Sequence, residues 1–265
     1  MVSVFNLERD LLLRDEIRSA EQFRDIEKIF AARGFTPGAN SVLFIDEAQE
    51  STTFGGFVRF MKEEWMFATV ILTGSSITKI FSEESRVPVG RLEYLRVTPL
   101  TFAEFALNSA DADQFEEARR VPLHITDYTH RMLMQRYDHY LRVGGMPAIV
   151  QQFQSGAEMH ELEIAWQEIF LSQQEDFIRK EPKLKPHLFR EGAQAVADLL
   201  GSTFSLTRVS QNHRDAKLAI ATLCEWQIVY RCDQPTVSPT SEPRPKLYLH
   251  DLGLARSLRG TSLPS

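Results

Sequence analysis

Nearly continuous runs of apolar residues near the start of the chain predict three buried β-strands. They are "VSVFNL" (2–7), "NSVLFI" (40–45) and "MFATVILTGSS" (66–76), the last of which ends in small polar residues. Between them, apolar residues recur at helical spacing over residues 14–34, which end in a glycine placed as a C-cap, and over residues 52–64. Apolar strands that alternate with helices are typical of a parallel sheet in an α/β protein.

The pattern continues with one more strand and a well-marked helix start. "RLEYLRVTPL" (91–100) predicts a fourth strand, and "TFAEFAL" (101–107) predicts a helix. Thr101 is suited to the N-cap of this helix, and Glu104 three residues later completes a capping box. We therefore expect an α/β domain over residues 1–108.

Beyond residue 108 the pattern becomes helical. "SADADQFEEARR" (109–120) is a polar, acidic bridge, and helices are predicted at 126–142, 147–154, 158–180 and 187–200. The last part is predicted as helix, "SLTRVSQN", helix, strand "IVYRC", a proline-rich loop and strand "KLYLH". This is the element order of a winged helix. We expect a helical region at 109–186 and a winged-helix-like domain at 187–265.

Composition narrows the class of protein. Apolar residues make up 43% and charged residues 25% of the chain, as in ordinary globular proteins. No apolar run approaches the roughly 20 residues of a membrane span, the N-terminus does not resemble a secretory signal, and Cys224 and Cys232 fit neither a disulfide framework nor a zinc site. These features predict a cytoplasmic protein without a membrane partner.

Charge is distributed unevenly along the chain. The net charge of −6 argues against a general nucleic-acid binder. From Thr207 onward, however, basic residues outnumber acidic ones. This asymmetry is a mild indication of two functional halves.

Polar residues follow two of the predicted strands at their carboxyl ends, where parallel sheets bind ligands. Asp46 and Glu47 follow the strand at 40–45, and Thr73 to Ser76 end the strand at 66–76. In phosphoryl transfer, one such carboxylate can hold Mg²⁺, the next can orient the attacking water, and a neighbouring hydroxyl can contact that water or the γ-phosphate. The alternative is that Asp46 only caps the helix after residue 50.

Six segments together resemble AAA-type ATPases of bacteria and archaea that carry a C-terminal domain of unknown function. "LFIDEAQES", "ILTGSS" and "VGRLEYLRVTPLTFAEF" resemble the Walker B strand, the sensor-1 strand and the end of the ATPase core. "YLRVGGMPAIV", "QEDFIRK" and "KLYLHDLGLARSL" resemble the second domain. The resemblance implies a P-loop-type ATPase core with ATP and Mg²⁺ as cofactors.

The same resemblance implies roles for individual residues. Asp46 would hold Mg²⁺ through water, Glu47 would activate the attacking water, and Thr73 or Ser75 would be the sensor. Arg91 is a candidate arginine finger or sensor arginine, or else a surface arginine beside a strand. An arginine finger supplied in trans would require assembly, so a homo-oligomer is one expected arrangement.

The phosphate-binding loop of that family, G-x-x-x-x-G-K-[ST], does not occur in this chain, which contains no Gly-Lys dipeptide. Without the loop, the carboxylate pair would repel ATP. The family's loop strand is also the neighbour of the sensor-1 strand, so its absence would leave a gap or an exposed edge along 66–73. These observations predict an incomplete core lacking its first strand, a fragment that also ends early, and impaired hydrolysis by this chain.

A different class of function is a DNA- or protein-binding winged-helix module with structural carboxylates. The predicted second helix offers Arg214 and Lys217 near its start, and Arg244 and Lys246 on the wing could add phosphate contacts. A winged helix that only packs against other domains is the alternative. Asp251 is expected to cap the following helix or to pair with an arginine.

Overall fold

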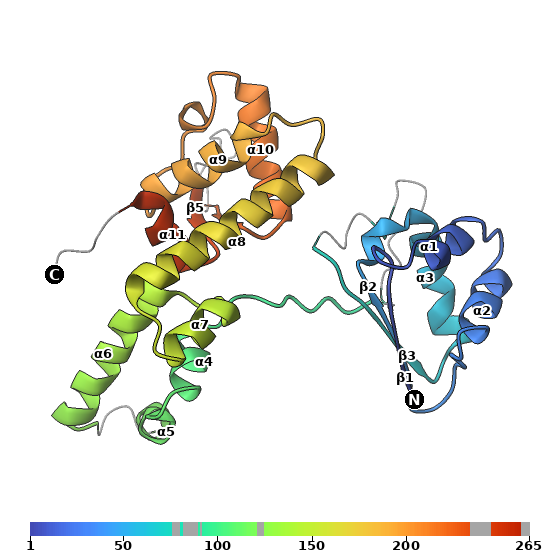
Figure 1. Cartoon of the computed structure of the whole chain (residues 1–265), viewed down its shortest axis with the longest axis horizontal. Coiled ribbons are helices and arrows are strands. Elements are labelled where there is room, and N and C mark those ends of the chain that lie inside the picture. Colours follow the sequence, from blue (N-terminus) through green and yellow to red (C-terminus); the bar gives the residue numbers. More distant parts are fainter. Residues whose placement is uncertain (76–79, 82–89, 91, 121–124, 234–244, 261–265) are drawn as a thin grey trace. The chain divides into compact units, whose positions relative to one another are not determined.

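The computed structural model describes residues 1–75, 80–81, 90, 92–120, 125–233 and 245–260. The chain forms two compact units, Met1–Arg96 and Val97–Ser265, called here the N-terminal and C-terminal units (Figure 1). None of the helices formed by the described residues has the length and apolar character to cross a membrane. The division into three parts at residues 108 and 186 remains a prediction.

The N-terminal unit alternates strands and helices. Its elements are β1 (Val2–Asn6), α1 (Leu11–Arg18), α2 (Phe23–Ala31), β2 (Ser41–Asp46), the 3₁₀ turn η1 (Ala48–Glu50), α3 (Thr52–Glu64) and β3 (Ala68–Leu72).

The single helix predicted at 14–34 is wrong, because the segment contains two helices. The first, α1, ends at Arg18, and a capping box between Gln22 and Asp25 starts α2. In that box, the backbone N–H of Gln22 donates to the Asp25 carboxylate over 3.1 Å. A local polar contact therefore overrides an apolar spacing that continues across the break.

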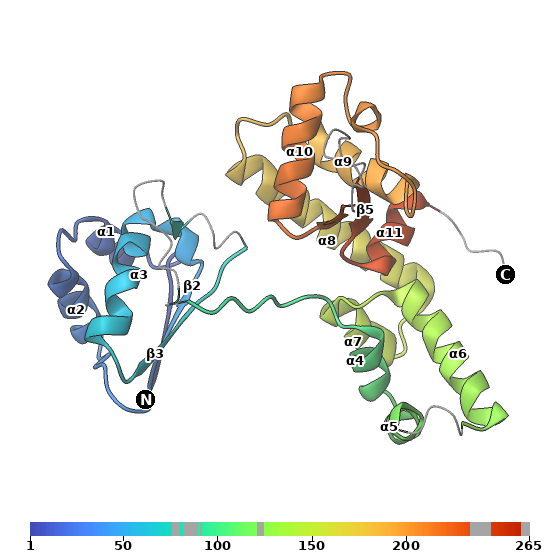
Figure 2. The same cartoon turned by 180° about the vertical axis from the view of Figure 1, so that it is seen from behind.

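The described strands of this unit form a parallel sheet in the order β1-β2-β3, with β2 in the centre. One face, which includes Leu43 and Ile45 of β2, is buried in a core with α1, α2 and α3. All three helices lie on this side of the sheet (Figures 1 and 2). On the opposite face Val4 is 64% and Ile71 is 39% exposed. Within the described residues, the sheet is thus covered on one face.

The fourth strand predicted at 91–100 is not formed. Residues 92–98 are described and have no strand structure, and Leu95 and Val97 are 88% and 89% exposed. A strand needs a neighbour to satisfy its backbone groups, and apolar β-prone residues alone do not supply one. Conversely, β3 pairs with β2 and has no second strand neighbour in the described part of the unit. The exposed edge along 66–73 stays a prediction.

The C-terminal unit is mainly helical. Its elements are α4 (Phe102–Leu107), α5 (Ala112–Arg120), α6 (Asp127–Val143), α7 (Pro147–Gln154), α8 (Met159–Lys180), α9 (His187–Asp198), η4 (Leu206–Arg208), α10 (His213–Glu225), β4 (Val229–Cys232), β5 (Lys246–Leu249) and α11 (Leu252–Arg259). The capping box of Thr101 and Glu104 at the start of α4 is confirmed. The bridge at 109–120 differs from the prediction in containing α5.

The last elements follow the order predicted for a winged helix. Helices α9 and α10 pack together around a shared core, with η4 between them in sequence, and β4 pairs with β5 antiparallel. Thr203 also forms a bridge with Lys246, which places a short extended segment beside β5. The connection at 234–244 that would form the wing lies outside the described residues, so the winged helix remains a proposal.

A buried polar junction holds the two ends of the C-terminal unit together. The Asp251 carboxylate, 3% exposed, accepts hydrogen bonds from the backbone N–H groups of Gly253, Leu254 and Gly145 over 2.7, 3.1 and 2.6 Å. Gly145 in turn accepts a hydrogen bond from the N–H of Leu100 over 2.7 Å. Asp251 therefore caps α11, as expected, and also anchors the break between α6 and α7.

Candidate functional site

The candidate site of the N-terminal unit lies where its strands end. Asn6 and Asp46 are register partners in β1 and β2, and Thr73 follows β3 directly. Thr73 Oγ1 donates a hydrogen bond to Asp46 Oδ1 over 2.6 Å, and Asn6 Nδ2 donates one to Asp46 Oδ2 over 2.7 Å. Both carboxylate oxygens of Asp46 are thus held by side chains from the neighbouring strand ends.

These contacts favour the ionised form of Asp46. The hydrogen bond from Thr73 is the main cause that lowers the pKa of Asp46, with further contributions from Asn6, the backbone N–H of Glu47 and the charge of Arg9. Partial burial opposes this effect without reversing it. Asp46 is therefore a negative charge at neutral pH, oriented at the carboxyl edge of the sheet.

Glu47 follows in a left-handed backbone conformation, with φ of 51° and ψ of 43°. This conformation is uncommon for a residue other than glycine, asparagine or aspartate. The Glu47 carboxylate accepts a hydrogen bond from the Gln49 side chain. A sharp turn thus places two carboxylates in succession at the end of β2.

The alternative role of Asp46 as a helix cap is wrong. The residue before η1 is Glu47, whose side chain makes no capping hydrogen bond, and α3 is capped by Ser51, which accepts from the N–H of Phe54 over 3.2 Å. The side-chain oxygens of Asp46 accept from Thr73 and Asn6 instead. Its carboxylate faces the neighbouring strand ends rather than a helix start.

The other predicted site residues are placed as follows. Of the two sensor candidates, Thr73 contacts Asp46, and Ser75 is exposed two residues further on. Arg91 lies outside the described residues. The roles proposed for Asp46, Glu47, Thr73, Ser75 and Arg91 stay predictions.

Three residues near the site were not predicted. Asn6 could have been found from the sequence, because parallel strands that end together place their last residues side by side. Arg9 donates its backbone N–H to Asn6 Oδ1 over 2.9 Å and contributes charge near Asp46. Gln49 lies against Gly74, where a Cβ would come within 1.7 Å of its Oε1 atom. No sequence signal marks this last contact.

The donor chemistry of the site suits Mg²⁺ better than a transition metal. Asp46, Glu47 and Thr73 offer only oxygen atoms, which hard cations prefer. The described part of the chain contains no cluster of three or more His, Cys, Asp or Glu residues arranged for a metal ion. Mg²⁺ commonly keeps several waters and uses one or two carboxylates, so the pair at 46–47 fits such an ion held through water.

A second candidate site lies on the C-terminal unit. Arg214 and Lys217 are exposed on α10, one turn apart. Asp215 between them forms an ion pair with Lys185 over 3.1 Å, so its charge is already matched. The two basic side chains are exposed on α10. Lys246 is the first residue of β5. Arg244 lies outside the described residues.

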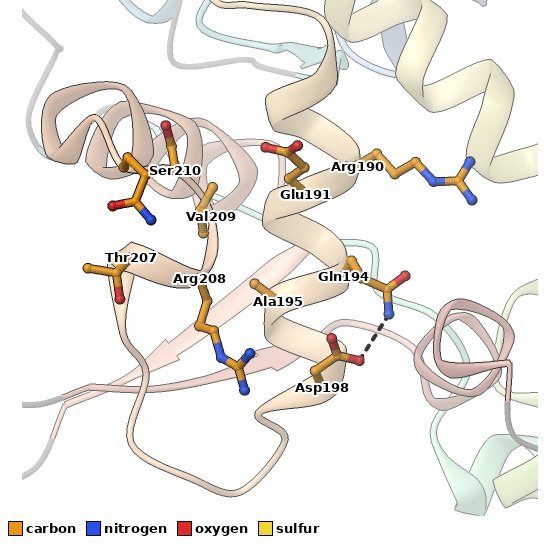
Figure 3. A pocket seen from close by; sticks show the side chains of 10 residues that line it. Arg190, Glu191, Gln194, Ala195, Asp198, Thr207, Arg208, Val209 and Ser210 are labelled. Atoms are coloured by element: carbon orange, nitrogen blue, oxygen red, sulfur yellow. Dashed lines mark hydrogen bonds between the residues drawn. The ribbon is translucent and has the colours of Figure 1, made fainter.

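A pocket of about 620 Å³ lies between α9 and the segment around η4. Figure 3 shows Arg208 reaching from this segment toward α9, where Gln194 donates a hydrogen bond to Asp198 over 3.0 Å. Arg190 and Glu191 add one charge of each sign to the lining. Because cations and anions are balanced, the pocket does not select an anionic ligand.

Two different family models match the N-terminal and the C-terminal parts of the chain. Residues 2–106 match the family model of an AAA domain, and residues 134–265 match that of a domain of unknown function, DUF8612. No curated protein matches the chain. Among solved structures, the Orc1 protein of Aeropyrum pernix in complex with DNA overlaps with 98% of this chain and 77% of its own at 12% identity. The TM-score of 0.35 is too low for this overlap to indicate a shared fold or function.

Proposed function

We propose that the ends of β2 and β3 form the metal- and water-binding half of an ATP-hydrolysis site. The match of residues 2–106 to an AAA domain supports this proposal. The main observation behind the proposal is that both carboxylate oxygens of Asp46 accept hydrogen bonds. Thr73 Oγ1 donates one over 2.6 Å, and Asn6 Nδ2 donates the other over 2.7 Å. A carboxylate kept ionised and oriented at the carboxyl edge of a parallel sheet is suited to a cation that accompanies phosphates.

Each residue of the site has a separate role in the proposed hydrolysis of ATP. Bound Mg²⁺ would neutralise charge on the β- and γ-phosphates. Asp46, whose two carboxylate oxygens are oriented by Thr73 and Asn6, would hold the waters of that ion. Glu47 orients the water that attacks the γ-phosphate, and Thr73 or Ser75 contacts this water or the γ-phosphate. Arg91 supplies positive charge to the transferring group, in the same chain or in an assembly.

We further propose that residues 1–265 alone bind ATP weakly and hydrolyse it poorly. The sequence contains no G-x-x-x-x-G-K-[ST] loop, so the backbone N–H groups and the lysine that usually hold the phosphates are not supplied by these residues. Asp46 and Glu47 then face the triphosphate with like charge, and only the cation offsets the repulsion.

The first test is a titration of a fluorescent ATP analogue into the chain, with and without Mg²⁺. We expect weak binding that requires Mg²⁺ and that disappears in Asp46→Asn. Glu47→Gln should keep the binding, because its role concerns the attacking water. The control is Glu64→Gln, which changes an exposed carboxylate at the end of α3 and should leave the titration unchanged.

Two results would contradict these statements. Tight, Mg²⁺-dependent binding would refute the proposed impairment while supporting the site. Binding that persists without Mg²⁺ and in Asp46→Asn would refute the site itself, because the nucleotide would then bind elsewhere.

The second candidate function is DNA or protein binding by the C-terminal unit as a winged helix. The favouring observation is the exposed pair Arg214 and Lys217 on α10, supported by the bridge of Thr203 with Lys246. A DNA duplex should bind with an affinity that falls as salt rises, and the double variant Arg214→Ala, Lys217→Ala should lose most of it. The control, Arg131→Ala with Lys183→Ala, removes the same charge from exposed positions on α6 and after α8. Equal loss in both variants would show unspecific charge attraction and would contradict this function.

A further inference from the structure

The side chain of Gln49 lies between the two strand ends of the candidate site. Gln49 belongs to η1, two residues after Glu47, and its Nε2 atom donates a hydrogen bond to the Glu47 carboxylate. Its Oε1 atom lies against Gly74, where an added Cβ would come within 1.7 Å of it. A single amide thus contacts both Glu47 after β2 and the backbone that follows β3.

This contact is made although two of its features are energetically unfavourable. The Oε1 atom of Gln49 is buried and accepts no hydrogen bond from the part of the chain that the structure describes, and a buried polar atom without a partner costs free energy. Glu47 has a left-handed backbone conformation, which is also costly for a residue with a side chain. Because both features oppose stability, a role in the site explains the contact better than a role in folding.

The backbone ties the turn that carries both residues to the end of β3. The N–H of Ala48 donates to the carbonyl oxygen of Thr73 over 2.9 Å, and the N–H of Thr73 donates to that of Ile45 over 2.9 Å. Glu47 and Gln49 are the two neighbours of Ala48 in sequence, so this ladder of hydrogen bonds fixes the backbone on which both side chains stand.

We propose that Gln49 is a positioning residue for the attacking water: its amide orients the Glu47 carboxylate, and Gly74 leaves the space that the amide occupies. The inference rests on the function proposed above, in which Glu47 acts on that water. A free glutamate side chain samples several rotamers, and only some of them point a carboxylate oxygen at the water. A donor beside one oxygen restricts this freedom, so a larger share of the molecules is oriented for the reaction.

The reaction that depends on this orientation is a transfer of the γ-phosphoryl group to water. The water oxygen forms a bond to the γ-phosphorus, the bond from this phosphorus to the bridging oxygen of the β-phosphate breaks, and ADP leaves with the bonding electrons. Glu47 accepts one proton of the water and afterwards returns it to the phosphate. Gln49 takes no part in these bonds and acts only through Glu47.

Two substitutions separate hydrogen bonding from packing. Gln49→Leu removes the donor, and Gln49→Glu keeps the shape of the side chain while placing two carboxylates against each other. An amide that only fills the space beside Gly74 would tolerate Gln49→Glu, whereas an amide that positions Glu47 tolerates neither change. Glu50→Gln is the matched control in the same turn, because the Glu50 carboxylate pairs with Arg14 over 3.5 Å.

The first measurement is the steady-state release of phosphate by residues 1–265 over a range of Mg·ATP concentrations. Gln49→Leu and Gln49→Glu should each lower kcat about 10-fold and change KM by less than about 2-fold. Glu47→Gln should lower kcat about 100-fold or more. Combining Gln49→Leu with Glu47→Gln should cause no further loss, since Gln49 acts through Glu47. Glu50→Gln should leave kcat and KM within about 2-fold of the wild type.

The second measurement does not depend on hydrolysis. In nitrogen-15 NMR spectra of the chain without nucleotide, the side-chain amide signals of Gln49 should shift in Glu47→Gln and in Gly74→Ala. They should stay unchanged in Glu50→Gln.

The results distinguish this inference from the proposed function. If phosphate release is no faster in the wild type than in Glu47→Gln, the proposed function fails and the role of Gln49 fails with it. If Glu47→Gln slows the release but Gln49→Leu or Gln49→Glu retains the wild-type kcat, only the role of Gln49 is wrong. Amide signals of Gln49 that are unchanged in Glu47→Gln would overturn the contact itself.

Discussion

Thr73 and Asp46 join the carboxyl ends of two neighbouring strands through a hydrogen bond of 2.6 Å between Oγ1 and Oδ1. The contact is possible because β2 and β3 are parallel and in register, with Ile45 opposite Leu72. It orients the carboxylate and keeps it ionised. The geometry of the candidate site therefore depends on a hydroxyl at position 73.

Thr73→Val should remove this hydrogen bond while keeping the side-chain shape. We expect a loss of about 1 kcal/mol in the free energy of unfolding at neutral pH and a rise in the pKa of Asp46 toward its ordinary value. Chemical denaturation and an NMR titration of the Asp46 carboxyl measure the two effects. Thr73→Ser, which retains the hydroxyl, is the control, and an unchanged pKa in Thr73→Val would contradict the assignment.

The same contact predicts a dependence of stability on pH. The pKa of Asp46 is lower in the folded protein than the value of about 3.9 in an unfolded chain. Its ionised form thus stabilises the fold fully above that value, and this contribution is lost as the pH falls through the folded pKa. The difference in unfolding free energy between the wild type and Thr73→Val should shrink from pH 7 to pH 3. An equal difference at both values would argue against a bond to the ionised carboxylate.

Two adjacent glycines of α3 should respond in opposite ways to substitution by alanine. A Cβ at Gly55 would lie 1.9 Å from the backbone oxygen of Ile80, whereas one at Gly56 would meet no atom within 4 Å. Gly55→Ala should destabilise the N-terminal unit by about 1 to 3 kcal/mol, and Gly56→Ala should stabilise it by about 1 kcal/mol through helix propensity. Thermal denaturation of both variants decides the matter, and similar melting temperatures would refute the close approach at Gly55.

Gly74→Ala should disturb the site more than the fold. The new Cβ would displace the flexible end of Gln49 and so break its hydrogen bond to Glu47. We expect a change below about 1 kcal/mol in stability, together with a shift of the Gln49 side-chain amide resonances. In a double-mutant cycle with Gln49→Ala, the effects of the two substitutions should be strongly non-additive. Additive effects would mean that the two residues do not share a contact.

Asp251→Ala should be among the most damaging single changes in the C-terminal unit. It leaves the N–H groups of Gly145, Gly253 and Leu254 without the buried acceptor they now share, at an expected cost of about 3 kcal/mol or more. Thr126→Ala, which removes an exposed N-cap from α6, should cost about 1 kcal/mol. If urea denaturation gives the two variants equal stability, the junction does not contribute beyond an ordinary cap.

The local pattern of apolar and polar residues was sufficient to predict much of this protein's structure. The strands at β1, β2 and β3, the capping box of Thr101 and Glu104, and the placement of Asp46, Glu47 and Thr73 at strand ends follow from apolar runs and their polar boundaries, because these depend on neighbours in sequence. The AAA domain and the domain of unknown function were likewise recognisable from short motifs.

Other features depend on partners distant in sequence. Asn6 belongs to the site because the register of β1 with β2 places it beside Asp46. Residues 92–98 have the composition of a strand but stay without strand structure, since a strand forms only where another strand offers its backbone groups. The fold brings Gln49 against Gly74 and Asp251 against Gly144 so closely that neither glycine has room for a Cβ. Sequence therefore determined which residues could form strands, helices and the carboxylate pair, and the tertiary structure decided which of them meet.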